Sequence, residues 1–216
     1  MKEALFLSGI GTDIGKSYAT AWLLNHIARS GKKVITQKFI QTGCNGESID
    51  INMHRSLNRM KKTEADLNLT TAPIILSYPA SPHLAALIDK KPIDLSLAEA
   101  ATKRLLEVYD YDTVIIEGAG GIMVPINEDY LTIDYIAQHQ LPLAFVTHGN
   151  LGSISDTLLA LEAIRSRKID LRYVIYNPYF DHDKIIAEDA REYMRRKVNT
   201  MFPTAEYLIM DDNYTS

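Results

Sequence analysis

The sequence predicts an α/β fold in which helices flank a doubly wound, mostly parallel sheet. Short apolar runs rich in β-branched and aromatic residues recur along the chain, helical patterns lie between them, and most glycines gather just after the runs. Apolar runs without strict polar alternation are typical of strands buried on both faces. Their alternation with helices is the pattern of a parallel sheet.

Six strands and four helices are predicted along the chain. The strands are expected at residues 4–8, 34–40, 113–117, 143–147, 173–177 and 207–210. The helices are expected at residues 17–30, 95–109, 153–167 and 184–198. Gly31 follows the first helix, where a glycine at the C′ position commonly takes a left-handed conformation.

Residues 41–94 interrupt this alternation. They hold two glycines, four prolines and several polar stretches, yet they lack the composition of a linker. We expect an elaborated crossover between two strands rather than a second domain. Because single domains run to roughly 250 residues before they split, we expect one domain over residues 1–216.

The composition excludes several classes of protein. With 46% hydrophobic and 23% charged residues, the chain is neither disordered nor collagen-like. A net charge of −4 argues against a protein that coats nucleic acid or an anionic membrane. The single cysteine, Cys44, suits a reducing compartment, and no signal peptide or membrane-spanning run is visible. We expect a cytoplasmic protein without nucleic-acid or membrane partners.

Ten of the eleven glycines lie in four groups, each directly after a predicted strand. The groups are Gly9/Gly11/Gly15, Gly43/Gly46, Gly118/Gly120/Gly121 and Gly149/Gly152. Ligands of open parallel sheets bind outside the carboxyl ends of the strands. We therefore expect the four groups to converge on one site.

Residues 8–17, with the sequence SGIGTDIGKS, predict a phosphate-binding loop and hence a P-loop NTPase-like fold. Glycines let backbone N–H groups surround phosphates, and the helix that follows adds a positive dipole. In such loops the lysine, here Lys16, reaches the β and γ oxygens, and the hydroxyl, here Ser17, ligates Mg²⁺. A glycine-rich turn without a ligand is the alternative, but strand, loop, lysine, hydroxyl and helix all occur in order.

A carboxylate ends the apolar strand at 113–117. Glu117 resembles the acidic strand tip that helps to hold the Mg²⁺ of a nucleotide. Alone, a strand-end charge that reaches solvent would be the simpler explanation. The following residues 118–121, Gly-Ala-Gly-Gly, let the backbone approach a phosphate or substrate closely and favour the functional interpretation.

Lys38 lies near the carboxyl end of the second predicted strand, among apolar residues. A lysine buried there is costly unless it meets an anion. The alternative is a lysine on an edge strand whose ammonium group reaches water.

Taken together, these motifs resemble the dethiobiotin synthetase family. The family loop has the form Gly-x-Asp-Thr-x-Val-Gly-Lys-Thr, and the chain follows it at Gly9, Thr12, Gly15, Lys16 and Ser17, including the five residues that separate Gly9 from Gly15. The resemblance continues in the family's order over roughly residues 4–195. Further matching positions are Lys38, Thr42-Gly43, Ser48, Asp50, Ser81-Pro82-His83, Glu117 to Gly121, Leu151 to Ile154, Asn177 and Glu192-Tyr193-Met194.

The resemblance implies ring closure of 7,8-diaminopelargonic acid with CO₂, giving dethiobiotin, ADP and phosphate in biotin biosynthesis. The reaction passes through a carbamate and a carbamic–phosphoric anhydride. It implies a ligase that forms C–N bonds, with ATP as co-substrate and Mg²⁺ as cofactor. It also implies a homodimer whose active site lies at the subunit interface, where the helix start at 149–155 receives the substrate carboxylate from the neighbouring subunit.

The resemblance also implies roles for individual residues. The catalytic residues would be Lys16 and Lys38, the latter as base or electrostatic clamp, and the metal ligands Ser17, Asp50 and Glu117. The substrate would contact Thr42, Ser155 and Tyr193. The nucleotide would contact Thr12, Asp13, Ile14, Gly15, Lys16, Ser17, Tyr18, Asp50, Glu117, Gly118, Ala119, Gly120 and Asn177.

Simpler explanations exist for several of these residues. An aspartate such as Asp50 is usually a solvated loop residue, Asn177 could cap the turn that follows its strand, and Ser153 could cap a helix. No role is expected for four histidines whose spacing suggests no metal site: His54, His83, His139 and His148.

Two other functions compete with the ligase. A partition-type switch ATPase binds partners in a nucleotide-dependent way, but its signature lysine would stand where this chain has Gly11. A small-molecule or nucleotide kinase is the second, with Arg195 and Arg196 as lid charges, although an exposed basic helix face explains that pair. The preferred nucleotide base stays open.

Overall fold

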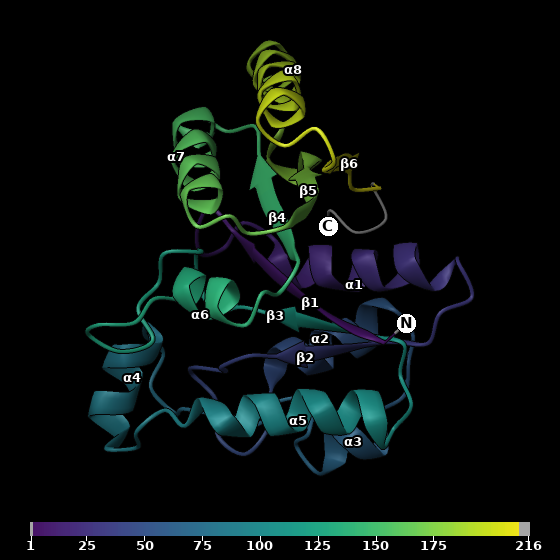
Figure 1. Cartoon of the computed structure of the whole chain (residues 1–216), viewed down its shortest axis with the longest axis vertical. Coiled ribbons are helices and arrows are strands. Elements are labelled where there is room, and N and C mark those ends of the chain that lie inside the picture. The colour runs from purple at the N-terminus through teal and green to yellow at the C-terminus, as the bar shows by residue number, and fades with distance from the viewer. Residues whose placement is uncertain (1, 212–216) are drawn as a thin grey trace.

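The computed structural model describes residues 2–211, and these residues contain a six-stranded sheet in which all neighbouring strands are parallel (Figure 1). The strand order is β2-β3-β1-β4-β5-β6. The strands are β1 (Glu3–Gly9), β2 (Val34–Lys38), β3 (Thr113–Glu117), β4 (Leu143–His148), β5 (Leu171–Asn177) and β6 (Glu206–Ile209). The predicted α/β class is confirmed, although β2 ends two residues earlier than expected.

All four predicted helices are present, and shorter ones accompany them. The predicted helices are α1 (Lys16–Ala28), α5 (Leu95–Glu107), α7 (Ser153–Ser166) and α8 (Lys184–Met201). The others are α2 (Ile49–Leu57), α3 (Glu64–Leu67), α4 (Pro82–Asp89), α6 (Thr132–Gln138) and the 3₁₀ turn η1 (Pro178–Phe180). Residues 41–94 form the expected crossover, with α2, α3 and α4 inside it.

Local capping explains where two of the crossover helices begin. The Ser48 hydroxyl accepts the N–H of Ile51 at the start of α2. Thr63 and Asp66 form a reciprocal capping box at the start of α3. A side-chain acceptor at this position stabilises a helix by about 1 kcal/mol.

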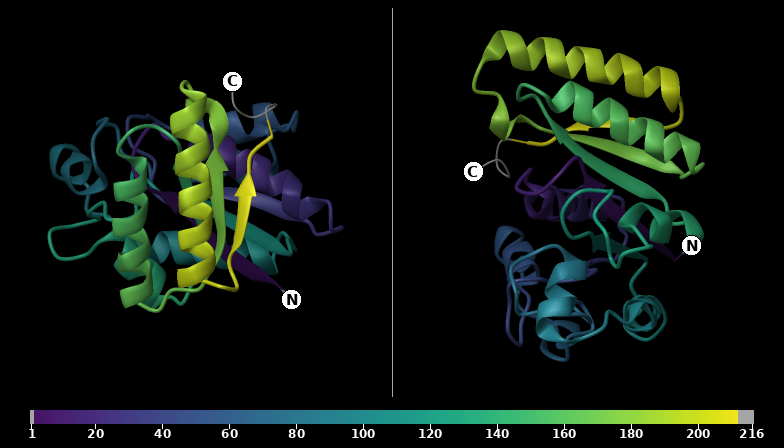
Figure 2. Two further views of the ribbon diagram at one scale, coloured as in Figure 1. Left: turned by 90° about the horizontal axis from the view of Figure 1, so that it is seen from above. Right: turned by 90° about the vertical axis from the view of Figure 1, so that its left-hand side faces the viewer.

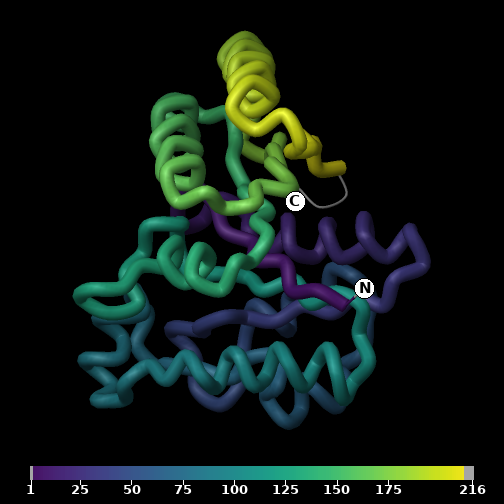
Figure 3. The backbone as a smooth tube through the Cα atoms, viewed as in Figure 1, coloured from purple at the N-terminus to yellow at the C-terminus, as the bar shows by residue number. Residues whose placement is uncertain are grey.

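The two faces of the sheet carry different helices (Figure 2). The side chains of Leu5 and Leu7 pack with α1 on one face, whereas Phe6 points into the core beneath α5, α6 and α7. Helix α2 packs against α1 and β2. The segments between β2 and β3 gather beside the β2 edge, and those after β4 gather at the β6 edge (Figure 3).

The register of the central strands brings two charged residues together. Lys38 is the partner of Glu117 across β2 and β3, and Glu117 is the partner of Leu7 across β3 and β1. Because side chains alternate along a strand, both charged side chains lie on the face that α1 and α2 cover.

The segment 71–76 lies along the end of β2. The Lys38 N–H donates to the Thr71 carbonyl at 2.7 Å, and the Gln41 N–H donates to the Ile74 carbonyl at 2.9 Å. The Leu76 N–H donates back to the Gln41 carbonyl at 2.8 Å. The crossover therefore occupies the outer side of the edge strand just where the strand ends.

Gly31 takes the predicted left-handed conformation, with a φ of 84°. Helix α1 ends at Ala28 with Arg29 as its C-cap, so Gly31 stands one residue after the C′ position where it was expected. Its N–H donates to the Ala28 carbonyl at 2.9 Å. Within residues 2–211, no helix combines the length and apolarity needed to cross a bilayer.

A buried ion pair joins the first two crossover helices. The Arg55 guanidinium donates to both oxygens of Asp66, from Nε at 2.9 Å and from Nη2 at 2.8 Å, and both side chains are 3% exposed. Burial raises the pKa of Asp66, but the hydrogen bonds and charge of Arg55 outweigh it, so the pKa lies below its ordinary value.

This ion pair predicts a pH-dependent contribution to stability. Because the pKa of Asp66 is lower in the folded chain, its contribution is present above the ordinary carboxyl pKa of 3.8 and is lost as the pH falls through the lower folded value. We expect Asp66→Asn to lower the free energy of unfolding by about 3–5 kcal/mol at pH 7. Between pH 5 and 3, the free energy of unfolding of the Asp66→Asn variant should fall less steeply with pH than that of the wild type.

Urea unfolding at several pH values measures both effects. Glu64→Gln, at an exposed carboxylate in the same helix, is the control and should change stability by less than about 0.5 kcal/mol. An Asp66→Asn variant with the wild-type pH dependence would contradict the explanation.

Candidate functional site

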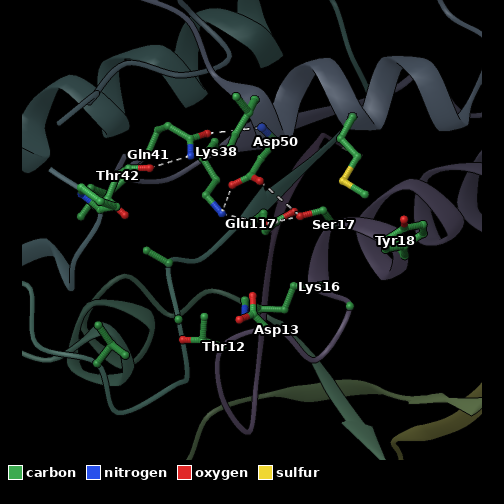
Figure 4. A pocket seen from close by; sticks show the side chains of 18 of the residues that line it. Thr12, Asp13, Lys16, Ser17, Tyr18, Lys38, Gln41, Thr42, Asp50 and Glu117 are labelled. Atoms are coloured by element: carbon green, nitrogen blue, oxygen red, sulfur yellow. Dashed lines mark hydrogen bonds and ion pairs between the residues drawn. The ribbon is translucent and has the colours of Figure 1, made fainter. Parts of the chain in front are cut away.

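A cavity of about 810 Å³ opens at the carboxyl ends of the central strands (Figure 4). The predicted site residues that line it are Thr12, Asp13, Gly15, Lys16, Ser17, Tyr18, Lys38, Thr42, Asp50, Glu117, Ala119, Gly120 and Asn177. Two further predicted residues meet the site through their carbonyl groups, since Ile14 accepts from Asn177 and Gly118 accepts from Lys38.

The prediction that all four glycine groups converge on one site was wrong for this cavity. The first and third groups contribute Gly15 and Gly120, but the glycines after β2 and β4 are not among the lining residues. Ser155 and Tyr193 also lie outside the cavity. Ser155 is exposed on α7. Tyr193 lies on α8, and the ammonium nitrogen of Lys197 lies 5.4 Å from the centre of its aromatic ring.

Gly15 and Asn177 form a tight contact in the phosphate loop. Gly15 has a φ of 83°, and a Cβ there would collide with the Asn177 amide. That amide donates from Nδ2 to the Ile14 carbonyl at 3.0 Å, and its oxygen accepts the Tyr179 N–H at 3.1 Å. Asn177 is thus both the turn cap that a simpler explanation expected and a link from β5 to the loop.

Lys16 folds back across the loop that precedes it. Its ammonium group donates to the Gly11 carbonyl at 2.6 Å. Burial lowers the pKa of Lys16 to about 8, although Glu117 and Asp50 act in the opposite direction. An anion bound in the loop would favour the charged ammonium group and raise this pKa again.

Lys38 forms the centre of a buried charge cluster. Its Nζ lies 2.5 Å from an Asp50 oxygen and 2.7 Å from Oε1 of Glu117, and it also donates to the Gly118 carbonyl at 3.2 Å. The side chain is only 6% exposed, so the alternative of a lysine that reaches water was wrong, even though β2 is an edge strand. Burial disfavours the charge, but Glu117 and Asp50 outweigh it and raise the pKa of Lys38.

Asp50 lies in the first turn of α2, so its interpretation as a solvated loop residue was wrong. The Oε1 atom of Gln41 accepts both the Ser48 hydroxyl and the Asp50 N–H. This side chain therefore links the end of β2 to the start of α2. The link and the Ser48 cap together aim Asp50 at the cavity.

Three oxygen-bearing side chains converge in a way that suits Mg²⁺. The Ser17 hydroxyl lies 3.1 Å from Oε1 of Glu117 and 3.5 Å from Oδ1 of Asp50. Hard oxygen ligands are those that Mg²⁺ prefers, usually one or two carboxylates completed by phosphate and water. In the described part of the chain, no three carboxylate, imidazole or thiol groups form a metal cluster. The groups that could bind Mg²⁺ here are therefore one hydroxyl and two carboxylates.

Two further side chains, Thr20 and His54, contact the carboxylate of Glu117. Oε2 of Glu117 accepts from the Thr20 hydroxyl at 2.9 Å and lies 2.7 Å from Nε2 of His54. Burial raises the pKa of Glu117, but Lys38 and His54 outweigh it and hold the pKa far below its usual range. His54 was expected to have no role; it follows Asp50 by four residues, and that spacing places both on one helix face.

The Ser153 hydroxyl does not cap α7. Gly152 is the residue that precedes the helix, and no side-chain cap is formed there. The Ser153 hydroxyl is buried and has no hydrogen-bond partner among the described residues.

Comparison with known proteins places the chain among close relatives. A family model described as an AAA domain matches residues 3–207. The ATP-dependent dethiobiotin synthetase BioD 2 of Pasteurella multocida is 42% identical over 211 residues, which cover 98% of each chain. The enzyme of the same name from Haemophilus ducreyi is 45% identical over 211 residues, 98% of this chain and 99% of the relative.

Solved structures share the fold at low identity. The structure titled pNOB8 ParA bound to nonspecific DNA has a TM-score of 0.54 at 15% identity and covers 98% of this chain and 87% of its own. The receptor FtsY from Elizabethkingia anophelis in complex with GDP has a TM-score of 0.55 at 12% identity, covering 100% of this chain and 59% of that one. At such identities the likeness shows the fold alone.

The contact between Gly15 and Asn177 predicts a specific effect of a single methyl group. Gly15→Ala would strain a left-handed backbone by about 1–2 kcal/mol and would displace the Asn177 amide. We expect nucleotide binding to weaken by about tenfold or more, or about 1.4 kcal/mol, as measured by calorimetry with ADP.

Gly31→Ala is the matched control, because Gly31 has a φ of 84° and open space around its Cβ position. It should lose similar stability and bind ADP like the wild type. Equal ADP affinities in the two variants would show that the Asn177 contact is not important for binding.

Proposed function

The chain belongs to the family of ATP-dependent dethiobiotin synthetases, and we propose that the cavity at the ends of its central strands is where the ring of dethiobiotin is closed. The enzyme is a ligase of biotin biosynthesis that forms C–N bonds and uses ATP. The observation that carries the proposal is the buried cluster of Lys38, Asp50 and Glu117 beside the phosphate loop.

The proposed reaction joins 7,8-diaminopelargonic acid and CO₂. One substrate amine forms a carbamate, a carbamate oxygen attacks the γ-phosphorus of ATP, and ADP leaves. The second amine then attacks the carbonyl carbon of the mixed anhydride and releases phosphate. Phosphoryl transfer needs positioning and charge neutralisation more than covalent catalysis, and the cationic groups of the cavity supply both.

Lys16 is proposed to bind the β and γ phosphates, with Mg²⁺ held by Ser17, Asp50 and Glu117. When bound, the metal would neutralise charge on the phosphates during transfer. The remaining nucleotide contacts are proposed for the loop residues that line the cavity and for Asn177.

Lys38 is proposed to act on the amine and carbamate end of the substrate. Its pairing with the Asp50 and Glu117 carboxylates favours the charged ammonium group, which supports a role as an electrostatic clamp. Thr42 lines the same cavity and is proposed to bind the same end of the substrate.

A homodimer is proposed to complete the substrate site. Ser155 is exposed, and Leu151 just before α7 is 83% exposed. In such a dimer, the N–H groups at the start of α7 would receive the carboxylate of the substrate bound in the neighbouring subunit. Tyr193 is proposed to contact the chain of the substrate. We also propose that residues 1–216 form a single domain, although residues 1 and 212–216 lie outside the described part. The proposed location of the protein is the cytoplasm.

The proposed function predicts the outcome of one assay and one substitution. Purified protein supplied with 7,8-diaminopelargonic acid, bicarbonate, Mg²⁺ and ATP should form dethiobiotin, detected by mass spectrometry. Lys38→Ala should lose this turnover by about a hundredfold or more, the scale for loss of one electrostatic stabiliser, and keep its affinity for ADP. Lys16→Ala should lose ADP affinity itself.

Lys33→Ala is the control, because Lys33 is exposed just before β2 and pairs with Asp110 on the surface; its turnover should equal that of the wild type. Absence of dethiobiotin with both ATP and GTP would refute the proposed function. Wild-type turnover in Lys38→Ala would refute the role of Lys38 alone.

A further inference from the structure

A row of buried hydrogen bonds lies behind Glu117. His54 is fully buried and does not line the cavity, yet its ring contacts Glu117 on one side and Thr36 on the other. The Thr36 hydroxyl also accepts from Nη1 of Arg55 at 2.8 Å. The row therefore runs from the crossover ion pair to the carboxylate of the proposed metal site.

The two oxygens of Glu117 have different partners. Oε1 faces Lys38 at 2.7 Å and the Ser17 hydroxyl at 3.1 Å, on the side of the cavity. Oε2 faces Nε2 of His54 at 2.7 Å and the Thr20 hydroxyl at 2.9 Å, on the buried side. The carboxylate thus offers one oxygen to the site and has the other fixed by the protein.

The direction of these hydrogen bonds follows from the groups involved. A guanidinium can only donate and a carboxylate can only accept. The Thr36 hydroxyl therefore accepts from Arg55, and the same oxygen lies 3.0 Å from Nδ1 of His54. Because the Glu117 carboxylate can only accept, Nε2 of His54 is the donor in this contact.

The glutamate needs this support because its own torsion does not fix it. The terminal torsion of a glutamate side chain has a broad, roughly two-fold preference, so hydrogen bonds must decide which oxygen faces the cavity. Thr20 alone is a weak anchor, since its hydroxyl also lies 2.8 Å from the Lys16 carbonyl and has one hydrogen to give. The His54 ring is held rigidly by Thr36, and Thr36 by the arginine that pairs with Asp66.

We propose that His54 is a positioning residue for Mg²⁺, which fixes Oε2 of Glu117 so that Oε1 stays aimed at the metal beside Ser17 and Asp50. The inference rests on the proposed function, because it assumes the magnesium site described there. Outer hydrogen-bond partners of metal ligands typically change metal affinity by about 10–100-fold when removed.

The test measures metal dependence of nucleotide binding instead of turnover. Calorimetry with the non-hydrolysable analogue AMP-PCP is carried out in EDTA and over a series of Mg²⁺ concentrations. His54→Leu keeps a buried apolar side chain but removes the donor, and it should raise the Mg²⁺ concentration for half-maximal tightening by about tenfold. Binding in EDTA should stay at the wild-type value, and His54→Gln, which restores an N–H donor, should recover most of the loss.

His139→Leu is the control, because His139 is a partly exposed histidine that pairs with Glu99, away from Glu117; it should behave like the wild type. Thr36→Val keeps His54 but removes the hydroxyl that orients it, and it should shift the Mg²⁺ dependence in the same direction. If His54→Leu does not fold, the Mg²⁺ dependence of Thr36→Val tests the inference in its place, and an unchanged dependence would overturn it.

The outcomes separate the inference from its premise. If the wild type shows no tightening with Mg²⁺, the proposed metal site fails, and the inference fails with it. If the wild type tightens but folded His54→Leu requires the same Mg²⁺ concentration, the inference alone is overturned. An equal loss of affinity in EDTA and in Mg²⁺ would also overturn it, because it would show general damage to the nucleotide site.

Discussion

The ion pair between Lys38 and Glu117 is the interaction on which the rest of the site depends. The two residues are partners across β2 and β3, and their side chains are 6% and 1% exposed. An ion buried without a partner costs several kcal/mol, so each of the two charges stabilises the other in its buried place. Once the pair is buried, its remaining hydrogen-bonding capacity must also be satisfied. That requirement explains why polar groups from α1, α2 and the loop after β3 gather at this point.

The crossover supplies what the sheet cannot. From one face of α2, Asp50 gives Lys38 a second carboxylate, and His54 gives Glu117 a contact on its buried side. The position of α2 is in turn fixed at both ends, by the link through Gln41 and by the ion pair of Arg55. A single short helix therefore sets the charge balance of the cavity and the orientation of its most buried carboxylate.

Local patterns made most of the fold predictable. The apolar runs located all six strands, although the apolar residues after Lys38 made β2 two residues too long, because they are buried without continuing the strand. The crossover helices were missed because they are too short for a clear apolar period. At the site, the loop motif identified Lys16 and Ser17, whereas the contact of His54 with Glu117 joins residues 63 apart. Such a contact depends on how α2 packs against the sheet, which the spacing of Asp50 and His54 does not reveal.

The pairing of segment 71–76 with the end of β2 has a consequence for association between molecules. The outer side of an edge strand presents N–H and C=O groups that any extended chain can pair with. Here the crossover already uses those groups from Lys38 to Gln41. The strand end that carries the most important lysine is thereby closed to foreign strands. The segment that pairs with the end of β2 thereby also acts against aggregation at this edge of the sheet.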